Sequence, residues 1–353
     1  MGGAPLRRRA GLAALLLAGV LGAWPGARAA QAEAVTDAAG RVVAVPAQVE
    51  RVFPAGPPAG LVLFSLAPER MVGWTLRPAP AALAFLGPQA DKPVLGWLAG
   101  RGGDANLEAV LQRRPDLIVD IGMTSGTYVS LAERVQQATS IPVLLLDGRL
   151  TALPGTYRTL GAALGVAAAG AERADWIAGQ LGAIATRLQG VPAADRPKVY
   201  LARGTTGLES ARAGAINVEA VEAAGGRNVV GEALGAGSLV TVSMEQLLAF
   251  DPDVIVALDP GFFARMRDDP AWRELRAVTT GKVVLAPQLP FPWVDYPPSV
   301  NRVIGVVWLA TLLHPAIMDI DLRGAAKEFY RLFYHHALTD AELDGLMKDA
   351  RFQ

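Results

Sequence analysis

The chain lacks cysteine, and this absence excludes disulfide bonds, thiolate metal sites and a lipid anchor on an N-terminal cysteine. Histidine is scarce: the three histidines all lie near the C-terminus, where we expect surface or helix-end positions. A histidine-rich zinc or manganese site is therefore not expected. An excess of positive charge is also missing, because 33 lysines and arginines balance 33 aspartates and glutamates. That balance argues against a nucleic-acid binder.

Common enzyme signatures are absent as well. The sequence has no G-x-S-x-G elbow, no H-E-x-x-H pair, no P-loop and no G-x-G-x-x-G after a predicted strand. We therefore predict that the protein is not an enzyme and uses no cofactor. Apolar residues nevertheless make up 52% of the 353 residues, which is enough to build a large core.

The N-terminal segment has the pattern of an export signal. A basic triplet, Arg7 to Arg9, precedes an apolar run of about fifteen residues, which is short for a membrane span. Two A-x-A sequences follow, and they predict cleavage after Ala29 or Ala32. Residues 1–32 are thus predicted to be a cleaved signal peptide of a soluble periplasmic protein that is not a lipoprotein. A retained anchor and twin-arginine export are the alternatives.

Two segments of the chain resemble each other at an offset of 137 residues. One is NLEAVLQRRPDLIVDIG from Asn106, and the other is SMEQLLAFDPDVIVALD from Ser243. Each begins with an N-cap residue, continues as a short amphipathic helix and stops at Pro-Asp. Each then enters an apolar run that is typical of a parallel strand covered on both faces. The repeat predicts two lobes of the same construction.

Further strands are predicted around Val52, Val199, Val143 and Val283, and Leu160 to Gln189 has the pattern of one long helix. The fold class is therefore predicted to be α/β, with two Rossmann-like lobes that have mostly parallel central sheets and are joined by a single long helix. Helices are also predicted from Asn301 to Leu313 and near the C-terminus. The expected boundaries are 33–152 for the N-terminal lobe, 153–190 for the linking helix and 191–353 for the C-terminal lobe.

Aromatic and arginine side chains recur in the loops after the predicted strands. Ligands of open α/β sheets bind beyond the carboxyl ends of the strands, so both lobes would contribute loops to one cleft. Rings offer flat apolar contact and arginines offer charge and forked donors, which suits a bulky anionic or chelated ligand, with no metal held directly by the protein. The predicted ligand-binding residues are Trp97, Tyr128, Arg203, Phe291, Trp293, Tyr296 and Arg302.

The paired segments resemble those of the periplasmic substrate-binding proteins of ABC importers for ferric siderophores, haem and vitamin B12. The first strands, the linking helix and the C-terminal EFYRLFY add to this resemblance, which covers the chain from about Val42. It implies that Glu108 and Glu245 pair with arginines of the membrane permease, although a carboxylate in a first helical turn is also favoured by the helix dipole alone. It also implies ligand contacts by Trp97 and Arg302.

The leading hypothesis is that a monomeric protein captures a ferric siderophore or a similar metal chelate and delivers it to an inner-membrane ABC permease dimer with its ATPase. The alternatives within the family are cobalamin, a nickel chelate, and an oxyanion such as molybdate or tungstate. A periplasmic enzyme that uses Asp295 as an acid or base, and a structural protein of the envelope, are alternatives of other classes.

Overall fold

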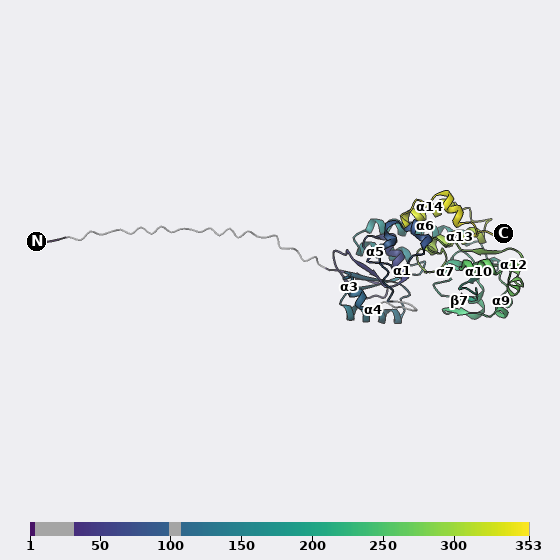
Figure 1. Ribbon diagram of the computed structural model, residues 1–353, viewed down its shortest axis with the longest axis horizontal. Coiled ribbons are helices and arrows are strands. Elements are labelled where there is room, and N and C mark those ends of the chain that lie inside the picture. The colour runs from purple at the N-terminus through teal and green to yellow at the C-terminus, as the bar shows by residue number, and fades with distance from the viewer. Residues whose placement is uncertain (4–31, 99–106, 353) are drawn as a thin grey trace.

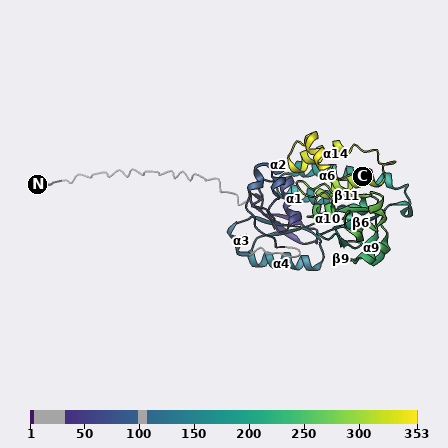
Figure 2. The same cartoon turned by 45° about the vertical axis from the view of Figure 1, so that its right-hand side comes forward.

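The computed structural model describes residues 1–3, 32–98 and 107–352. Two α/β lobes lie side by side, and helices of the middle and the end of the chain lie across the top of both in two views (Figures 1 and 2). Residues 4–31 of the predicted signal peptide lie outside the described residues. Within the described ranges, we find no helix with the length and apolar character needed to span a membrane.

The N-terminal lobe is built on a parallel sheet with the strand order β3-β4-β5. Side chains alternate between its faces: Val119 packs in the main core with helix α1, whereas Ile118 packs with Ala132 and Val135 of helix α4. The apolar run is therefore covered on both sides, as predicted. The bounds are β3 (Val52–Pro54), β4 (Leu117–Gly122), β5 (Val143–Asp147), α1 (Pro57–Leu66), α3 (Leu107–Gln112) and α4 (Gly126–Thr139), with a hairpin of β1 (Glu33–Thr36) and β2 (Val42–Val45) at the start.

The C-terminal lobe repeats this plan with a parallel sheet in the order β11-β10-β6-β8, and a two-stranded antiparallel sheet, β7-β9, lies beside it. The predicted strands are confirmed in both lobes. The bounds are β6 (Lys198–Ala202), β7 (Glu209–Ala211), β8 (Arg227–Asn228), β9 (Leu239–Thr241), β10 (Val254–Ala257), β11 (Val283–Leu285), α7 (Glu219–Ala223), α8 (Val229–Leu234), α9 (Met244–Phe250), α10 (Pro260–Arg265), α11 (Pro270–Arg273) and α12 (Arg276–Thr279).

The Pro-Asp step of the repeat has a structural explanation. The carboxylate of Asp116 accepts hydrogen bonds of 2.9 Å from the backbone N–H groups of Glu50 and Arg51. In the other lobe, Asp253 accepts one of 2.8 Å from the backbone N–H of Lys198. Each aspartate thus ties the start of one strand to the start of its neighbour, so the same residue type recurs at the same point of both lobes.

The linking segment is not one continuous helix. It consists of α5 (Leu153–Ala163) and α6 (Ala167–Leu188), separated by a turn in which Gly165 has a φ of +67°. The two helices cross where Gly161 meets Gly170, and a methyl group at Gly170 would collide with a backbone carbonyl of α5. The prediction of an unbroken helix from Leu160 to Gln189 is therefore wrong, because its small residues serve close helix packing. Helix α6 is the helix through which the chain passes from the first lobe to the second.

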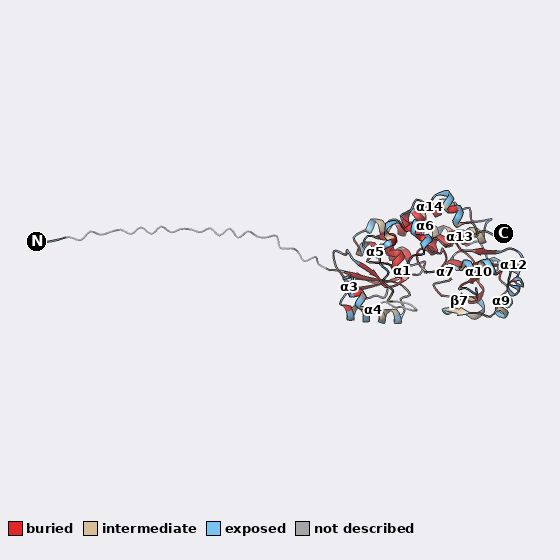
Figure 3. Cartoon of the chain, in the orientation of Figure 1, coloured by how far each residue is buried: buried red, intermediate tan, exposed pale blue. Residues whose placement is uncertain are grey.

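The C-terminal helices complete a core that both lobes share. Helix α13 (Asn301–Leu313) is buried over most of its length, as is the aromatic segment Tyr330–Tyr334 that continues α14 (Leu322–Phe329). One hydrophobic cluster joins Val119, Ile184, Leu201 and Trp308, which come from the first lobe, α6, the second lobe and α13. Figure 3 shows this continuity as buried ribbon running from α1 through α6 into α13. The predicted terminal helix is interrupted after Tyr334 and resumes as α15 (Asp340–Leu346).

Candidate functional site

Hydrogen bonds between the lobes show which edges of the sheets meet. The backbone N–H of Leu150, just past β5, donates to the carboxylate of Glu219 in α7 at 2.9 Å. The hydroxyl of Ser299, just before α13, donates to the carbonyl of Pro58 in α1 at 2.9 Å. The carboxyl end of β5 therefore faces the second lobe. We call the loops that follow the carboxyl ends of the strands in both lobes the interlobe edge.

Arg302 lies within this junction and has no exposed surface. Its guanidinium donates to the carbonyl of Ile216 at 2.8 Å and to the carboxylate of Glu219 at 2.7 Å, both in the second lobe. It also donates to the carbonyl of Gly148 in the first lobe. Burial lowers the pKa of Arg302, and the Glu219 carboxylate opposes that shift. The side chain was expected to contact a ligand, but here it bridges the two lobes.

Arg203 directly follows β6 and is also nearly buried, with 2% of its surface exposed. Its Nε donates to Asp295 at 2.8 Å, and its Nη1 is paired with Glu209. Asp295 is fully buried and accepts two further hydrogen bonds of 3.0 Å from the Asn217 amide. Burial raises the pKa of Asp295, and the charge of Arg203 acts against that shift. Asp295 therefore braces Arg203 inside the lobe.

The proline-rich loop after β11 separates its three aromatic residues. Trp293 is fully buried and donates from its indole nitrogen to the hydroxyl of Tyr330 at 3.2 Å. Phe291 is half-buried, with its ring centroid 6.0 Å from that of Trp74. Tyr296, in contrast, is 48% exposed and lies over the guanidinium of Arg203, 4.5 Å from the ring centroid. Of these three rings, Tyr296 is the one that presents a large exposed surface.

Two predicted ligand residues lie at the interlobe edge of the first lobe. Trp97 is half-buried, and the next residue, Leu98, donates its backbone N–H to the carbonyl of Ala55 just past β3 at 2.6 Å. Tyr128 is half-buried in the first turn of α4, which follows β4. The structure thus brings Trp97 and Tyr128 to the ends of adjacent strands.

The two acids predicted to dock the permease are exposed, one in the first turn of α3 and one in the first turn of α9. Both helices lie on the side of the lobes away from α6 and α14 (Figures 1 and 2). Ser243 and Gln246 form the expected capping box, and a hydrogen bond with the Ser243 side chain lowers the pKa of Glu245. The corresponding cap residue of α3, Asn106, lies outside the described residues. Glu108 and Glu245 thus occupy equivalent surface positions.

Sequence reasoning did not identify Glu209, Asn217 or Glu219, which partner the predicted arginines and Asp295. They come from short elements with no motif, and only the fold brings them to Arg203, Asp295 and Arg302. The histidines lie at helix ends or beside them, as expected: His314 ends α13, and His335 ends the segment after α14. Among the described residues, no group of three or more histidines, cysteines or acids is arranged to hold a metal.

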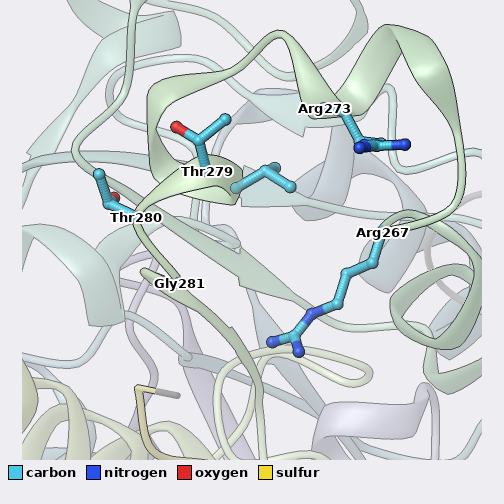
Figure 4. Close-up of a pocket in the computed structure, with 6 residues that line it drawn as sticks. Arg267, Arg273, Thr279, Thr280 and Gly281 are labelled. Carbon is cyan, nitrogen blue, oxygen red and sulfur yellow. The ribbon is translucent and has the colours of Figure 1, made fainter.

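A surface hollow of about 660 Å³ lies elsewhere in the second lobe (Figure 4). It is placed at the amino end of β11, since Gly281 and Thr280 precede that strand. This is the edge of the sheet opposite to the interlobe edge, so the hollow is separate from the candidate site. Its lining residues are Arg267, Arg273, Val278, Thr279, Thr280 and Gly281.

Comparisons with known proteins agree with this architecture. The family model described as "Periplasmic binding protein" matches residues 88–289. A stretch of 163 residues is 32% identical to the molybdate-binding protein MolA of Haemophilus influenzae and covers 43% of this chain and 42% of that protein. A cobalamin-binding protein of Halobacterium salinarum is 28% identical over 264 residues, which cover 70% of this chain and 66% of that protein. The chain thus spans less than two thirds of the length of either relative.

Among solved structures, an ABC transporter solute binding protein from Sulfurospirillum deleyianum matches with a TM-score of 0.79 and 26% identity, over 89% of this chain and 99% of that one. The structure of MolA matches with a TM-score of 0.73 and 21% identity, over 87% and 99% of the two chains, which supports the fold. Since the family model covers more than half of the sequence, this chain belongs to the periplasmic binding protein family, whose members are the solute-binding components of ABC transporters.

Proposed function

We propose that this protein captures a metal chelate, such as a ferric siderophore, at the interlobe edge and releases it unchanged to an inner-membrane ABC permease with its ATPase. The observation that carries the proposal is the placement of Tyr296, whose exposed ring is held over the buried Arg203 beside a proline-rich loop. A ring that is already fixed loses little freedom on binding, which favours contact with a large, flat ligand.

The first lobe supports the same proposal with Trp97 and Tyr128 at the ends of β3 and β4. Together with Tyr296 they make up the proposed ligand contacts. Arg203 lies against the Tyr296 ring, and Phe291 of the same loop packs near Trp74. We leave Trp293 and Arg302 out of this set, because both side chains are fully buried in contacts with other parts of the chain. Glu108 and Glu245 are the proposed docking points for the permease.

Two relatives favour other ligands. The cobalamin-binding relative aligns with 70% of this chain, and cobalamin is also a bulky metal complex with flat apolar surface. The molybdate-binding relative has the higher identity over a shorter stretch, and its ligand is a small oxyanion. Cobalamin fits exposed aromatic contacts better than molybdate does, so it is the second candidate.

The ligand is tested by native mass spectrometry of the protein purified from its own periplasm, followed by tryptophan-fluorescence titration with ferric siderophores, cobalamin and molybdate. A bound chelate and a saturable response to a ferric complex are expected. A response to molybdate alone would contradict the proposal, and a chemically altered ligand after incubation would indicate an enzyme. The intact mass also tests the export signal, because cleavage predicts a mature chain that starts at Ala30 or Glu33.

Docking is tested by reversing both charges, with Glu108→Arg and Glu245→Arg in one protein. We expect loss of transport in cells with no change in ligand affinity, because both side chains are exposed and neither is among the proposed ligand contacts. An equal loss of affinity would contradict the docking role.

A further inference from the structure

We infer that Glu209 sets the charge of the ligand that this site accepts, and that the second lobe favours a neutral or cationic metal complex over an anionic one. The inference rests on the proposed function, because it requires the ligand to bind at the interlobe edge. It concerns Glu209, the acid beside Arg203. The position of Arg203 would suggest a binding site for an anion if the partners of this arginine were left out of account.

Arg203 is not available to an anion. Its Nε is bound to Asp295 and its Nη1 to Glu209, while the ring of Tyr296 covers one face of the guanidinium. Two carboxylates therefore meet one cation, which leaves a net charge of one negative unit in this cluster. Only 2% of the surface of Arg203 reaches solvent.

The negative charge that remains accessible belongs to Glu209. Asp295 is fully buried and held by the Asn217 amide, so it cannot turn toward a ligand. The side chain of Glu209 is 38% exposed, and its carboxylate lies 3.5 Å from the hydroxyl of Tyr296. A ligand that stacks on Tyr296 would therefore meet a carboxylate at the edge of the ring.

The other cations near this site have partners other than Glu209. Arg149 is paired with Asp147 and Arg302 with Glu219, so each of these cations is matched by an acid. Arg265 donates to the carbonyl of Thr205 beside Arg203, and Asp259 lies at the start of the same helix. Among the described residues at this edge and their partners, the cations are Arg149, Arg203, Arg212, Arg265 and Arg302, and the acids are equal in number: Asp147, Glu209, Glu219, Asp259 and Asp295. Arg212, which follows β7, donates to the carbonyl of Leu234.

The experiment compares the affinities of wild-type protein and the Glu209→Gln variant for a cationic and a neutral ferric trihydroxamate, an anionic ferric tris-catecholate, and molybdate. We expect the wild type to bind the cationic or neutral complex most tightly. In the variant, the ratio of cationic to anionic affinity should fall by about tenfold, because one accessible charge has been removed near the ligand. This change should shrink at high salt.

Two further variants separate charge from structure. Glu209→Asp keeps the charge and should keep the wild-type preference. Glu232→Gln is the matched control, since Glu232 pairs with Arg227 at a similar exposure but at the amino ends of the strands, and no change is expected. Tightest wild-type binding of the anionic complex, or equal effects of Glu209→Gln on all probes, would overturn the inference and leave the proposed function standing. Failure of every ferric complex to bind would overturn the proposed function itself.

Discussion

The two lobes differ in whether a buried acid has a cationic partner. Asp120 in β4 and Ala257 in β10 occupy equivalent positions of the repeat, 137 residues apart. Asp120 shares a face of the sheet with Ile118, and the shift of its pKa has no arginine or lysine among its causes. The buried acid of the second lobe, Asp295, comes from a loop and is bound to Arg203. The two lobes, although built on equivalent strands, thus place their buried acids in different electrostatic surroundings.

This contrast shows how a duplicated framework can be specialised. The Asp116 and Asp253 ties are kept in both lobes, because they join neighbouring strands. The ends of the strands differ: the first lobe presents Trp97 and Tyr128, whereas the second presents Tyr296 above an ion-paired arginine. The framework is shared, and the proposed ligand contacts are divided between the lobes.

The largest expected effect comes from Arg302, whose guanidinium contacts residues of both lobes. The Arg302→Ala variant lacks the donors to Gly148, Ile216 and Glu219, and it leaves the half-buried carboxylate of Glu219 without its cation. We expect a loss of about 3–5 kcal/mol in the free energy of unfolding, measured with urea. A loss below about 1 kcal/mol would mean that the junction between the lobes does not depend on this bridge.

Asp120 in the first lobe predicts a pH dependence of stability. Burial raises the pKa of Asp120 to about 6, so the folded state prefers the protonated form. The resulting stabilisation is present at acidic pH and is lost as the pH rises through about 6. Asp120→Asn should therefore be more stable than the wild type at pH 7, by ~2–3 kcal/mol, and the difference should vanish near pH 4.

Urea unfolding of both proteins at several pH values measures this difference. Ala257→Asp supplies the reciprocal variant, which places an acid at the matching position of the second lobe and should lower its stability at pH 7. Destabilisation by Asp120→Asn at pH 7 would show that the carboxylate has a favourable partner, contrary to the prediction.

Variants of Tyr296 and Trp293 should separate effects on ligand affinity from effects on the stability of the fold. We expect Tyr296→Ala to weaken ligand binding by roughly tenfold, which is about 1.4 kcal/mol, with little change in unfolding. Trp293→Phe is the comparison, because it alters a buried ring of the same loop. It should reduce stability and leave affinity nearly unchanged in a fluorescence or calorimetric titration. The reverse pattern would exchange the assigned roles of the two rings.

The smallest expected effect concerns the helix that carries Glu245. The Ser243 hydroxyl accepts a hydrogen bond of 3.2 Å from the backbone N–H of Gln246 and completes the capping box. Ser243→Ala should cost about 1 kcal/mol of stability and raise the pKa of Glu245 toward its ordinary value. Thermal unfolding and NMR titration of the Glu245 carboxyl measure the two effects. An unchanged pKa would show that the serine does not influence the Glu245 carboxyl.

The amino-acid sequence by itself determined the framework. The repeat, the apolar runs and the Pro-Asp steps predicted both parallel sheets and their order along the chain, because strand burial and helix ends leave local patterns. They also identified the loop that carries Tyr296. The break between α5 and α6 was missed, since the small residues around Gly161 and Gly170 favour close packing, which a one-dimensional pattern does not distinguish from a continuous helix.

Only the tertiary structure decided which side chains are available. Arg203 meets Asp295 across 92 residues of chain, and Arg302 meets Gly148 across 154. No local pattern predicts such pairings, because they depend on how two lobes and their loops pack. The same packing buries Trp293 and exposes Tyr296, three residues apart in one loop. Residue type and position beside a strand were readable from the sequence, whereas burial and charge compensation depend on distant neighbours.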